Sequence, residues 1–390
     1  MKKYMILAAV AALTLAACAK VETSVVDVDG DVPVGFSTYS PKSLSKAGAT
    51  YTNTNALPTG SSIGVYGYST ESDAHFLGTE NPAFITNGEV AFSAASSSPT
   101  GATDKRYWPK DLKNLLTFYA YYPYNNAAVV GKPLATATGL GAFNVTQTGD
   151  VTTMVDFMIS DVENDMYFWD GTNASTNGYG RKSTITGTTK GIVPLSLHHM
   201  MSNVNFYFKT NITDDDITIT VKEASIAGVL SQGVFTPSYT VPTVAGERGE
   251  TTFGTAAVTE SAYASAVVIP IRSVVNDADV NSITLNTTAK INYADVAETT
   301  AKNNFLFVPQ TLTTTVKVTI KYDLTQGGST TTNTVVVPIM GDTNDENNPI
   351  VKWEYNRKYN YIFTIGLQEI LFTGAATNWT DGATGSLTAM

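Results

Sequence analysis

Cys18 is the only cysteine in the 390-residue chain, so any thiol chemistry of this protein must use this residue. A Lys2-Lys3 pair and an apolar run from Met5 to Leu15 precede it. A run of this length fits a cleaved secretory signal and is too short for a membrane-spanning helix. Residues 15–18 (LAAC) have the order of a bacterial lipobox. We predict a signal peptide over residues 1–17 and a lipid on Cys18 that anchors the protein in the outer membrane. An ordinary signal peptide is the alternative.

Three histidines, His75, His198 and His199, are the other side chains suited to acid–base or metal chemistry. Neighbouring histidines point to opposite faces of a strand, and a metal-binding pair on a helix needs residues four apart. The sequence lacks the HExxH, Walker and Rossmann motifs, and the one thiol is assigned to the lipid. We therefore predict no catalytic residue, no cofactor and no metal, and hence no enzyme. A pair of carboxylates that the fold brings together stays open as a hydrolase site.

Two acidic segments have the spacing of calcium ligands. Asp27, Asp29 and Asp31 lie two residues apart, and residues 342–347 (DTNDEN) form a second cluster. Neither is followed by the bidentate glutamate that an EF-hand requires. We interpret them as a solvated tether over residues 18–31 and a solvated turn.

Composition narrows the class of partner. The net charge of −10 argues against nucleic acid, because phosphate contacts need a basic surface. Only 15% of the residues are charged, which fits an exported protein rich in strands. Tyrosine occurs 20 times, with clusters over residues 119–124 and 355–361. Such rings could stack on sugars, but in β-proteins tyrosine more often packs a strand face.

Alternation of apolar and polar residues predicts half-buried strands through most of the chain. It is clearest over residues 204–208, 217–221, 283–285, 316–322 and 359–367. The run 334–340 is continuously β-rich, which predicts a strand buried on both faces. Short helices are expected only near residues 111–115 and 198–202. Many short strands separated by turns indicate all-β sandwiches. We place the domain boundary at the end of a loop-rich stretch, which gives domains over residues 32–190 and 191–390.

Five segments follow the lipobox in a fixed order. They are residues 106–123 (RYWP, then LTFYAYYP), 156–158 (DFM), 194–208 (PLSLHHMMSNVNFYF), 307–310 (FVPQ) and 353–361 (WEYNRKYNY). In this order they resemble the fimbrillin family of lipoprotein pilins, over most of the chain. The resemblance implies two transthyretin-like β-sandwich domains in tandem, and assembly with other pilin subunits into surface fimbriae.

The resemblance also implies a route of assembly. In the family, an arginine-specific protease removes the N-terminal segment with its first strand, and a strand of another subunit replaces it. The first arginine here is Arg106, beyond the expected cut, so Lys42 and Lys46 are the candidate processing sites. They lie in a polar segment, where cleavage is easy.

The strand that such a cut would release follows the tether directly. Val32, Val34 and Phe36 alternate with Pro33, Gly35 and Ser37, which predicts a first strand with one apolar edge. The candidate donor of the replacing strand is the tail over residues 380–390, with Leu387 and Ala389.

Two functions follow from these observations. The favoured one is a structural, adhesive pilin subunit, which leaves a host glycan or protein ligand open. The alternative is a monomeric glycan-binding lipoprotein on the outer-membrane surface that uses exposed aromatic rings.

Overall fold

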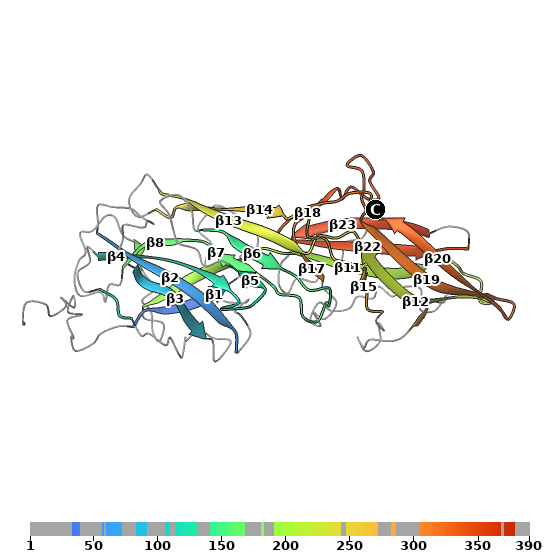
Figure 1. The fold of residues 1–390 in the computed structure, drawn as a ribbon, viewed down its shortest axis with the longest axis horizontal. Helices are drawn as coiled ribbons and strands as arrows, with labels where there is room; N and C mark the ends of the chain where they lie inside the picture. Colours follow the sequence, from blue (N-terminus) through green and yellow to red (C-terminus); the bar gives the residue numbers. More distant parts are fainter. Residues whose placement is uncertain are drawn as a thin grey trace, which may run out of the picture.

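The structure is a computed structural model that describes residues 33–39, 57, 60–71, 83–91, 106–109, 114–130, 141–167, 181–182, 191–242, 247–271, 282–285, 305–367 and 370–378. These residues form strands, turns and irregular segments without a helix, so the all-β prediction is confirmed. Within them, no helix is long and apolar enough to cross a membrane. Figure 1 shows an elongated molecule, with β1–β4 toward one end and β12, β19 and β20 toward the other.

Eight strands form the sheet of the N-terminal half, in the order β1-β10-β7-β4-β2-β3, with β8 beside β4 and β9 beside β8. Their bounds are β1 (Gly35–Tyr39), β2 (Ser62–Glu71), β3 (Ala83–Ala91), β4 (Asn114–Tyr122), β7 (Met158–Ser160), β8 (Glu163–Tyr167), β9 (Arg181–Lys182) and β10 (Ile192–His199). β1 runs parallel to β10, whereas the pairs between β10, β7, β4, β2 and β3 are antiparallel.

β4 lies inside this sheet and is buried on both faces, which its run of apolar and aromatic residues requires. Leu116 and Phe118 point into one apolar cluster, and Tyr119 and Tyr121 point into another on the opposite face. The sheet therefore contributes side chains to a different apolar cluster on each face of β4.

A second sheet covers the face that carries the tyrosines. It has the order β14-β13-β6-β5, with β5 (Val129–Val130), β6 (Phe143–Thr146), β13 (Gln232–Thr240) and β14 (Glu250–Ala257). Phe143 of β6 and Phe235 of β13 are buried in the same cluster as Tyr121. The ring centroids of Tyr121 and Phe143 lie 5.3 Å apart, so aromatic contacts join the two sheets.

The C-terminal half contains two further sheets around one core. The first has the order β17-β11-β22-β23, and the second β15-β12-β19-β20 with β16 beside β12. Their bounds are β11 (Ser202–Thr210), β12 (Ile217–Ala227), β15 (Val267–Val268), β16 (Ile283–Leu285), β17 (Phe305–Phe307), β19 (Lys317–Gln326), β20 (Ser329–Pro338), β22 (Arg357–Ile365) and β23 (Ile370–Asn378), with a small pair β18 (Gln310–Thr311) and β21 (Lys352–Trp353). Ile219, Ile320 and Phe363 belong to the core that the two larger sheets share. The transthyretin-like tandem stays a prediction.

The predicted boundary at residue 190 is crossed by strand pairing. β10 pairs with β1 and β7, and β13 pairs with β6. One apolar cluster contains Phe143, Phe235 and Val308, which come from both sides of the boundary. Separating residues 32–190 from residues 191–390 would therefore break sheets. The division into two domains at this point stays a prediction.

Most of the alternating runs form the strands that they predict, for example β12, β16 and β19. The prediction of a strand buried on both faces over residues 334–340 is wrong, because β20 ends its sheet and Val336 is 53% exposed. The helix near residues 198–202 is also wrong, since β10 and β11 occupy that segment. Of the helix near 111–115, the two described residues begin β4. Strand pairing with distant segments overrides the local preference at these places.

Candidate functional site: the first-strand groove

β1 is the element on which the predicted assembly route depends, and it is paired on both sides at its start. Its five residues run parallel to β10, from Gly35 opposite Ile192 to Tyr39 opposite Ser196. On the other side, the backbone N–H of Val34 donates to the carbonyl of Arg106 at 2.8 Å. We call the space that β1 fills between β10 and residues 106–108 the first-strand groove.

The apolar side of β1 fills this groove with one large ring. Phe36 is 2% exposed and packs edge-on against Phe118 of β4, with the centroids 5.3 Å apart. Val34 packs against the same cluster, and Thr38 is buried. Gly35 and Ser37, which alternate with them, are only partly buried. Val32 lies outside the described residues. Burial of these side chains is the main contribution to the free energy that holds β1 in the groove.

Trp108 closes the groove beside Phe36. Its ring stands edge-on to Phe118 at 6.1 Å, and its Nε1–H donates to the carbonyl of Gly191 at 2.9 Å. The same carbonyl accepts the backbone N–H of Gly35 at 3.1 Å. Gly191 has a φ of 73°, a left-handed conformation that favours glycine. This corner therefore links the start of β1, the start of β10 and the wall of the groove.

A buried ionic cluster lies on β10 and the loop between β7 and β8. His198 Nε2 lies 3.1 Å from Asp161 Oδ2, and the Arg248 guanidinium lies 3.1 Å from the same oxygen and also contacts Glu163. Burial opposes ionisation of Asp161, but the hydrogen bond and charge of His198, with Arg248, outweigh it and hold the pKa of Asp161 below its ordinary value. Arg248 lies two residues before β14, so the cluster ties the second sheet to the first.

This cluster is not a hydrolytic triad. Ser196 Oγ and Asp161 Oδ2 both approach Nε2 of His198, at 3.5 Å and 3.1 Å. A triad needs the carboxylate on one ring nitrogen and the serine on the other. His199 bonds Asp156 through Nδ1 at 2.9 Å. Within the described residues, no group of three or more His, Cys, Asp or Glu side chains is placed to bind a metal.

The prediction of no catalytic residue did not take into account one GxSxG match in the sequence, at residues 60–64 (GSSIG). In a hydrolase this motif forms a sharp turn between a strand and a helix. Here Ser62 begins β2 and pairs with Ala91 of β3, so the segment is ordinary antiparallel sheet. The spacing alone therefore carries no catalytic meaning.

The tyrosines expected as the alternative sugar platform are mostly packed into cores. Tyr119 and Tyr361 have no exposed surface, and Tyr66 stacks on Tyr119 with centroids 5.0 Å apart. Burial raises the pKa of Tyr119 well above its ordinary value. These rings join sheets instead of facing a ligand.

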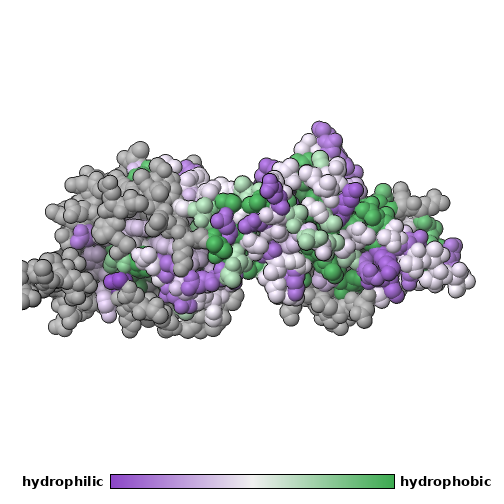
Figure 2. Space-filling view, in the orientation of Figure 1, coloured by the Kyte–Doolittle hydropathy of each residue, from purple (hydrophilic) through white to green (hydrophobic). Residues whose placement is uncertain are grey.

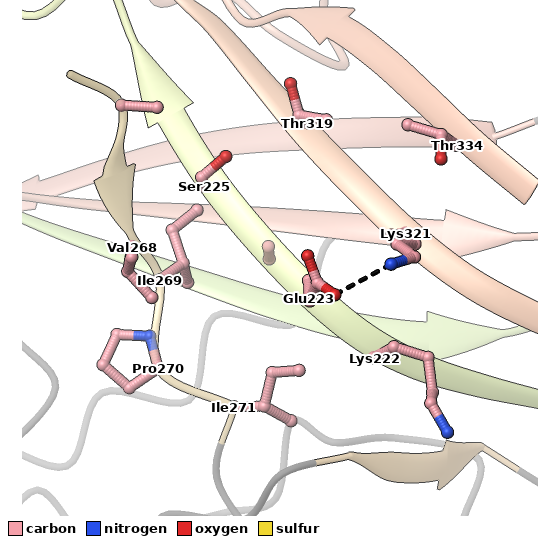
Figure 3. A pocket seen from close by; sticks show the side chains of 12 residues that line it. Lys222, Glu223, Ser225, Val268, Ile269, Pro270, Ile271, Thr319, Lys321 and Thr334 are labelled. Carbon is pink, nitrogen blue, oxygen red and sulfur yellow. Dashed lines mark hydrogen bonds and ion pairs between the residues drawn. The ribbon is translucent and has the colours of Figure 1, made fainter.

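One surface hollow of about 630 Å³ lies on the outer face of β12 and β19, beside β15. Figure 3 shows Glu223 and Lys321 facing each other across these strands. Lys321 Nζ donates to Glu223 at 2.9 Å, a contact that raises the pKa of Lys321 and keeps it protonated. Lys222 pairs with Asp323 at 3.7 Å. The hollow therefore offers neither a free nucleophile nor a pair of carboxylates.

The acidic turn over residues 342–347 folds back on its own backbone. Asp342 Oδ1 accepts from the backbone and side-chain N–H groups of Asn344, at 2.9 Å and 3.0 Å. Asp345 Oδ1 accepts from the backbone N–H of Asn347 at 2.9 Å. These are Asx turns of the kind found in solvated loops.

Several residues singled out in the sequence lie outside the described residues. They are Cys18, Asp27, Asp29, Asp31, Lys42, Lys46, His75, Leu387 and Ala389. Conversely, sequence reasoning missed Gly191 and Arg248, and it used Trp108 only as part of a motif. Nothing in the sequence marks Arg248, whose partners Asp161 and Glu163 precede it by more than 80 residues along the chain.

Comparison with known proteins agrees with this fold. A sequence profile described as fimbrillin-like matches residues 49–379. A fimbrium subunit, Fim1C, of Phocaeicola vulgatus is 30% identical over 128 residues, which are 32% of this chain and 32% of that protein. The match thus spans about a third of the relative. A crystal structure of a fimbrial protein from Bacteroides vulgatus superposes with a TM-score of 0.53 at 15% identity, covering 89% of this chain and 99% of that one. Because the profile covers most of its length, the chain belongs to the fimbrillin-like family.

Proposed function

We propose that this protein is a structural, adhesive subunit of surface fimbriae and has no enzymatic role. Membership of the fimbrillin-like family supports this, and the observation that carries it is the first-strand groove. In the groove a strand of five residues, close to the N-terminus, is held by one aromatic anchor and main-chain bonds. The partners are other pilin subunits, and the net charge of −10 disfavours nucleic acid.

Export as a lipoprotein is the first step of the proposal. The lipobox places a lipid on Cys18, which holds the precursor at the outer membrane before assembly. Cells that express the Cys18→Ser variant should lose labelling of this protein by a clickable fatty acid. Labelling that persists in the variant would contradict the lipid anchor and leave the rest of the proposal standing.

Cleavage near Lys46 or Lys42 would then release the anchor together with β1. The emptied groove would expose Phe118 and Trp108, and the loss of each large buried contact costs about 1.5–3 kcal/mol. It would also leave the backbone of β10 unpaired over residues 192–196, which lie opposite β1. An extended segment of another subunit can satisfy both by strand addition.

The tail over residues 380–390 is the proposed donor, and the groove suggests how to test it. If Leu387 replaces Val34, Ala389 falls at the place of Phe36, where a methyl group leaves the aromatic pocket underfilled. We expect Ala389→Phe to make polymers that resist dissociation by heat in detergent better than wild type. Thr388→Phe is the matched control, because it adds the same ring on the opposite face of the strand.

Electron microscopy of sheared surface material tests the function as a whole. Filaments that bind antibodies against this chain are expected from wild-type cells. Limited trypsin treatment of the purified protein should cut near Lys46 and convert monomers to polymers. A protein that is cut there and stays monomeric, with cells that lack filaments containing it, would defeat the proposal.

A further inference from the structure

β20 ends its sheet and, apart from Pro338 at its last position, has no charge or proline to protect this edge. No described strand pairs with its outer side, and its ten residues (STTTNTVVVP) contain no charge. Val336 is 53% exposed, and Thr330, Thr332 and Thr334 are exposed along the strand. A long, uncharged edge of threonine and valine is a template for another strand, because half of its backbone groups face outward.

Two other edges of the described sheets, at β3 and β23, are closed or interrupted. β3 carries Glu89, has Asn87 in a left-handed conformation, and shifts register against β2. On β23, the N–H of Gly374 donates to the carbonyl of Asn347 at 2.9 Å, so a loop blocks the middle of that edge. β20 therefore differs from these two edges, and Figure 2 shows apolar (green) residues on the C-terminal half, around the place of β20 and β23 in Figure 1.

We propose that β20 is a self-association surface, on which β20 of a second copy of this chain pairs in antiparallel fashion about a twofold axis. The strand is suited to itself, because antiparallel self-pairing of an uncharged strand sets no like charges opposite each other. The neighbouring charges on β19 are already paired, Lys321 with Glu223 and Asp323 with Lys222. The contact does not require removal of β1, so it is independent of strand replacement in the groove.

The threonine row supplies cross-strand contacts that this protein already uses. Thr325 and Thr330 hydroxyls lie 2.9 Å apart across the β19–β20 hairpin, and Ser238 and Thr252 lie 2.7 Å apart across β13 and β14. In a β20 pair, threonines on facing strands would meet in the same way. Hydroxyl pairs of this kind stabilise adjacent strands modestly, and a hydroxyl row does not favour a charged partner.

Cysteine cross-linking tests the pairing directly. With Cys18→Ser in the full chain, an introduced cysteine becomes the only thiol. We expect single cysteines at positions 330–334 to form disulfide dimers under mild oxidation, with one position near the axis reacting about tenfold faster than Thr373→Cys. Thr373 is an exposed residue on β23 and serves as the control. Equal rates at every position, or a monomer throughout in sedimentation, would overturn the proposal.

Salt and charge separate self-pairing from binding of a cationic partner. Two copies of a chain with net charge −10 repel each other, so raising the salt from about 0.01 M to about 1 M should strengthen the dimer. Thr332→Lys should weaken it about tenfold, because two lysines then lie near the axis. A dimer that weakens with salt, or that tolerates the lysine, would contradict pairing through β20.

Discussion

β1 and β20 each lie last in a sheet order, yet their side chains are buried to opposite degrees. Phe36 and Thr38 of β1 are 2% exposed, whereas Val336 of β20 is 53% exposed. The difference arises because residues 106–108 and Leu57 cover β1, while no described segment pairs with the outer side of β20. A strand at the end of a sheet can thus be a core element or an open surface. The first kind can be exchanged only by refilling a groove, and the second can be extended without loss.

The largest expected effect comes from emptying the groove at one position. Phe36→Ala removes the ring that packs on Phe118, and a buried Phe→Ala change costs about 3–5 kcal/mol of unfolding free energy. Urea unfolding followed by circular dichroism measures it. Ser37→Ala, on the partly buried side of the same strand, should cost under about 1 kcal/mol. Equal losses in both variants would mean that Phe36 does not anchor β1.

The ionic cluster behind β10 should come next. Arg248→Met leaves the buried carboxylate of Glu163 without this cation and Asp161 with His198 alone, and breaking a buried pair in this way costs about 3 kcal/mol. Lys222→Met removes a partner of Asp323 from a more exposed pair and should cost under about 1 kcal/mol. If urea unfolding gives the two variants the same stability, the cluster does not hold the second sheet in place.

The pH dependence of stability follows from Asp161 with a definite sign. Its folded pKa lies below the ordinary value of 3.8, so its contribution is fully present above pH 3.8 and is lost as the pH falls through the folded pKa. Asp161→Asn should remove this part of the acid loss, when wild type and variant are compared by urea unfolding from pH 5 downward in about half-unit steps. Parallel curves for the two proteins would contradict the assignment.

The sequence predicts much of the fold because strand patterning is a local property. Ile217, Ile219 and Val221 alternate in the chain and are buried in β12 as expected. Pairing is not local, and this explains the failures. The run of valines over residues 335–337 is typical of a buried strand. Its position at the end of a sheet depends instead on which strands pair.

The candidate site likewise has a part that the sequence predicts and a part that only the structure shows. Phe36 stands out from its alternation with small neighbours, and the structure places it in the aromatic pocket. The pocket itself needs Trp108, Phe118 and Gly191, which the chain brings together from separate segments. Likewise, Asn203 and Asn205 belong to the polar side of their predicted strand, yet both are buried, with Asn205 donating to Asn203 at 3.0 Å. Such polar contacts leave no periodic signal in a single sequence.

A smaller effect is expected at the wall of the groove. Trp108→Phe removes the Nε1–H that donates to the carbonyl of Gly191, but that carbonyl keeps the N–H of Gly35. The loss should be about 1–2 kcal/mol, from one hydrogen bond and some ring volume. Tyr107→Phe is the control, because Tyr107 is 37% exposed and should change little. Thermal unfolding compares them, and a larger loss for Tyr107→Phe would reverse the assignment of the wall.

The smallest effect on folding is expected at β20, where the change in association is proposed to be large. Thr332 is exposed and donates to Asp323 Oδ1 at 2.6 Å, and a lysine at this position can pair with the same carboxylate. Thr332→Lys should therefore change the unfolding free energy by under about 0.5 kcal/mol when the protein is dilute enough to be monomeric. Urea unfolding at two protein concentrations makes the measurement. A wild-type midpoint that rises with concentration, next to a Thr332→Lys midpoint that does not, would show that the residue acts between copies, because a dimer stabilises the folded state by mass action. A loss above about 1 kcal/mol in the dilute variant would instead mean that β20 is buried within the monomer, and the contrast between the two strands would fail.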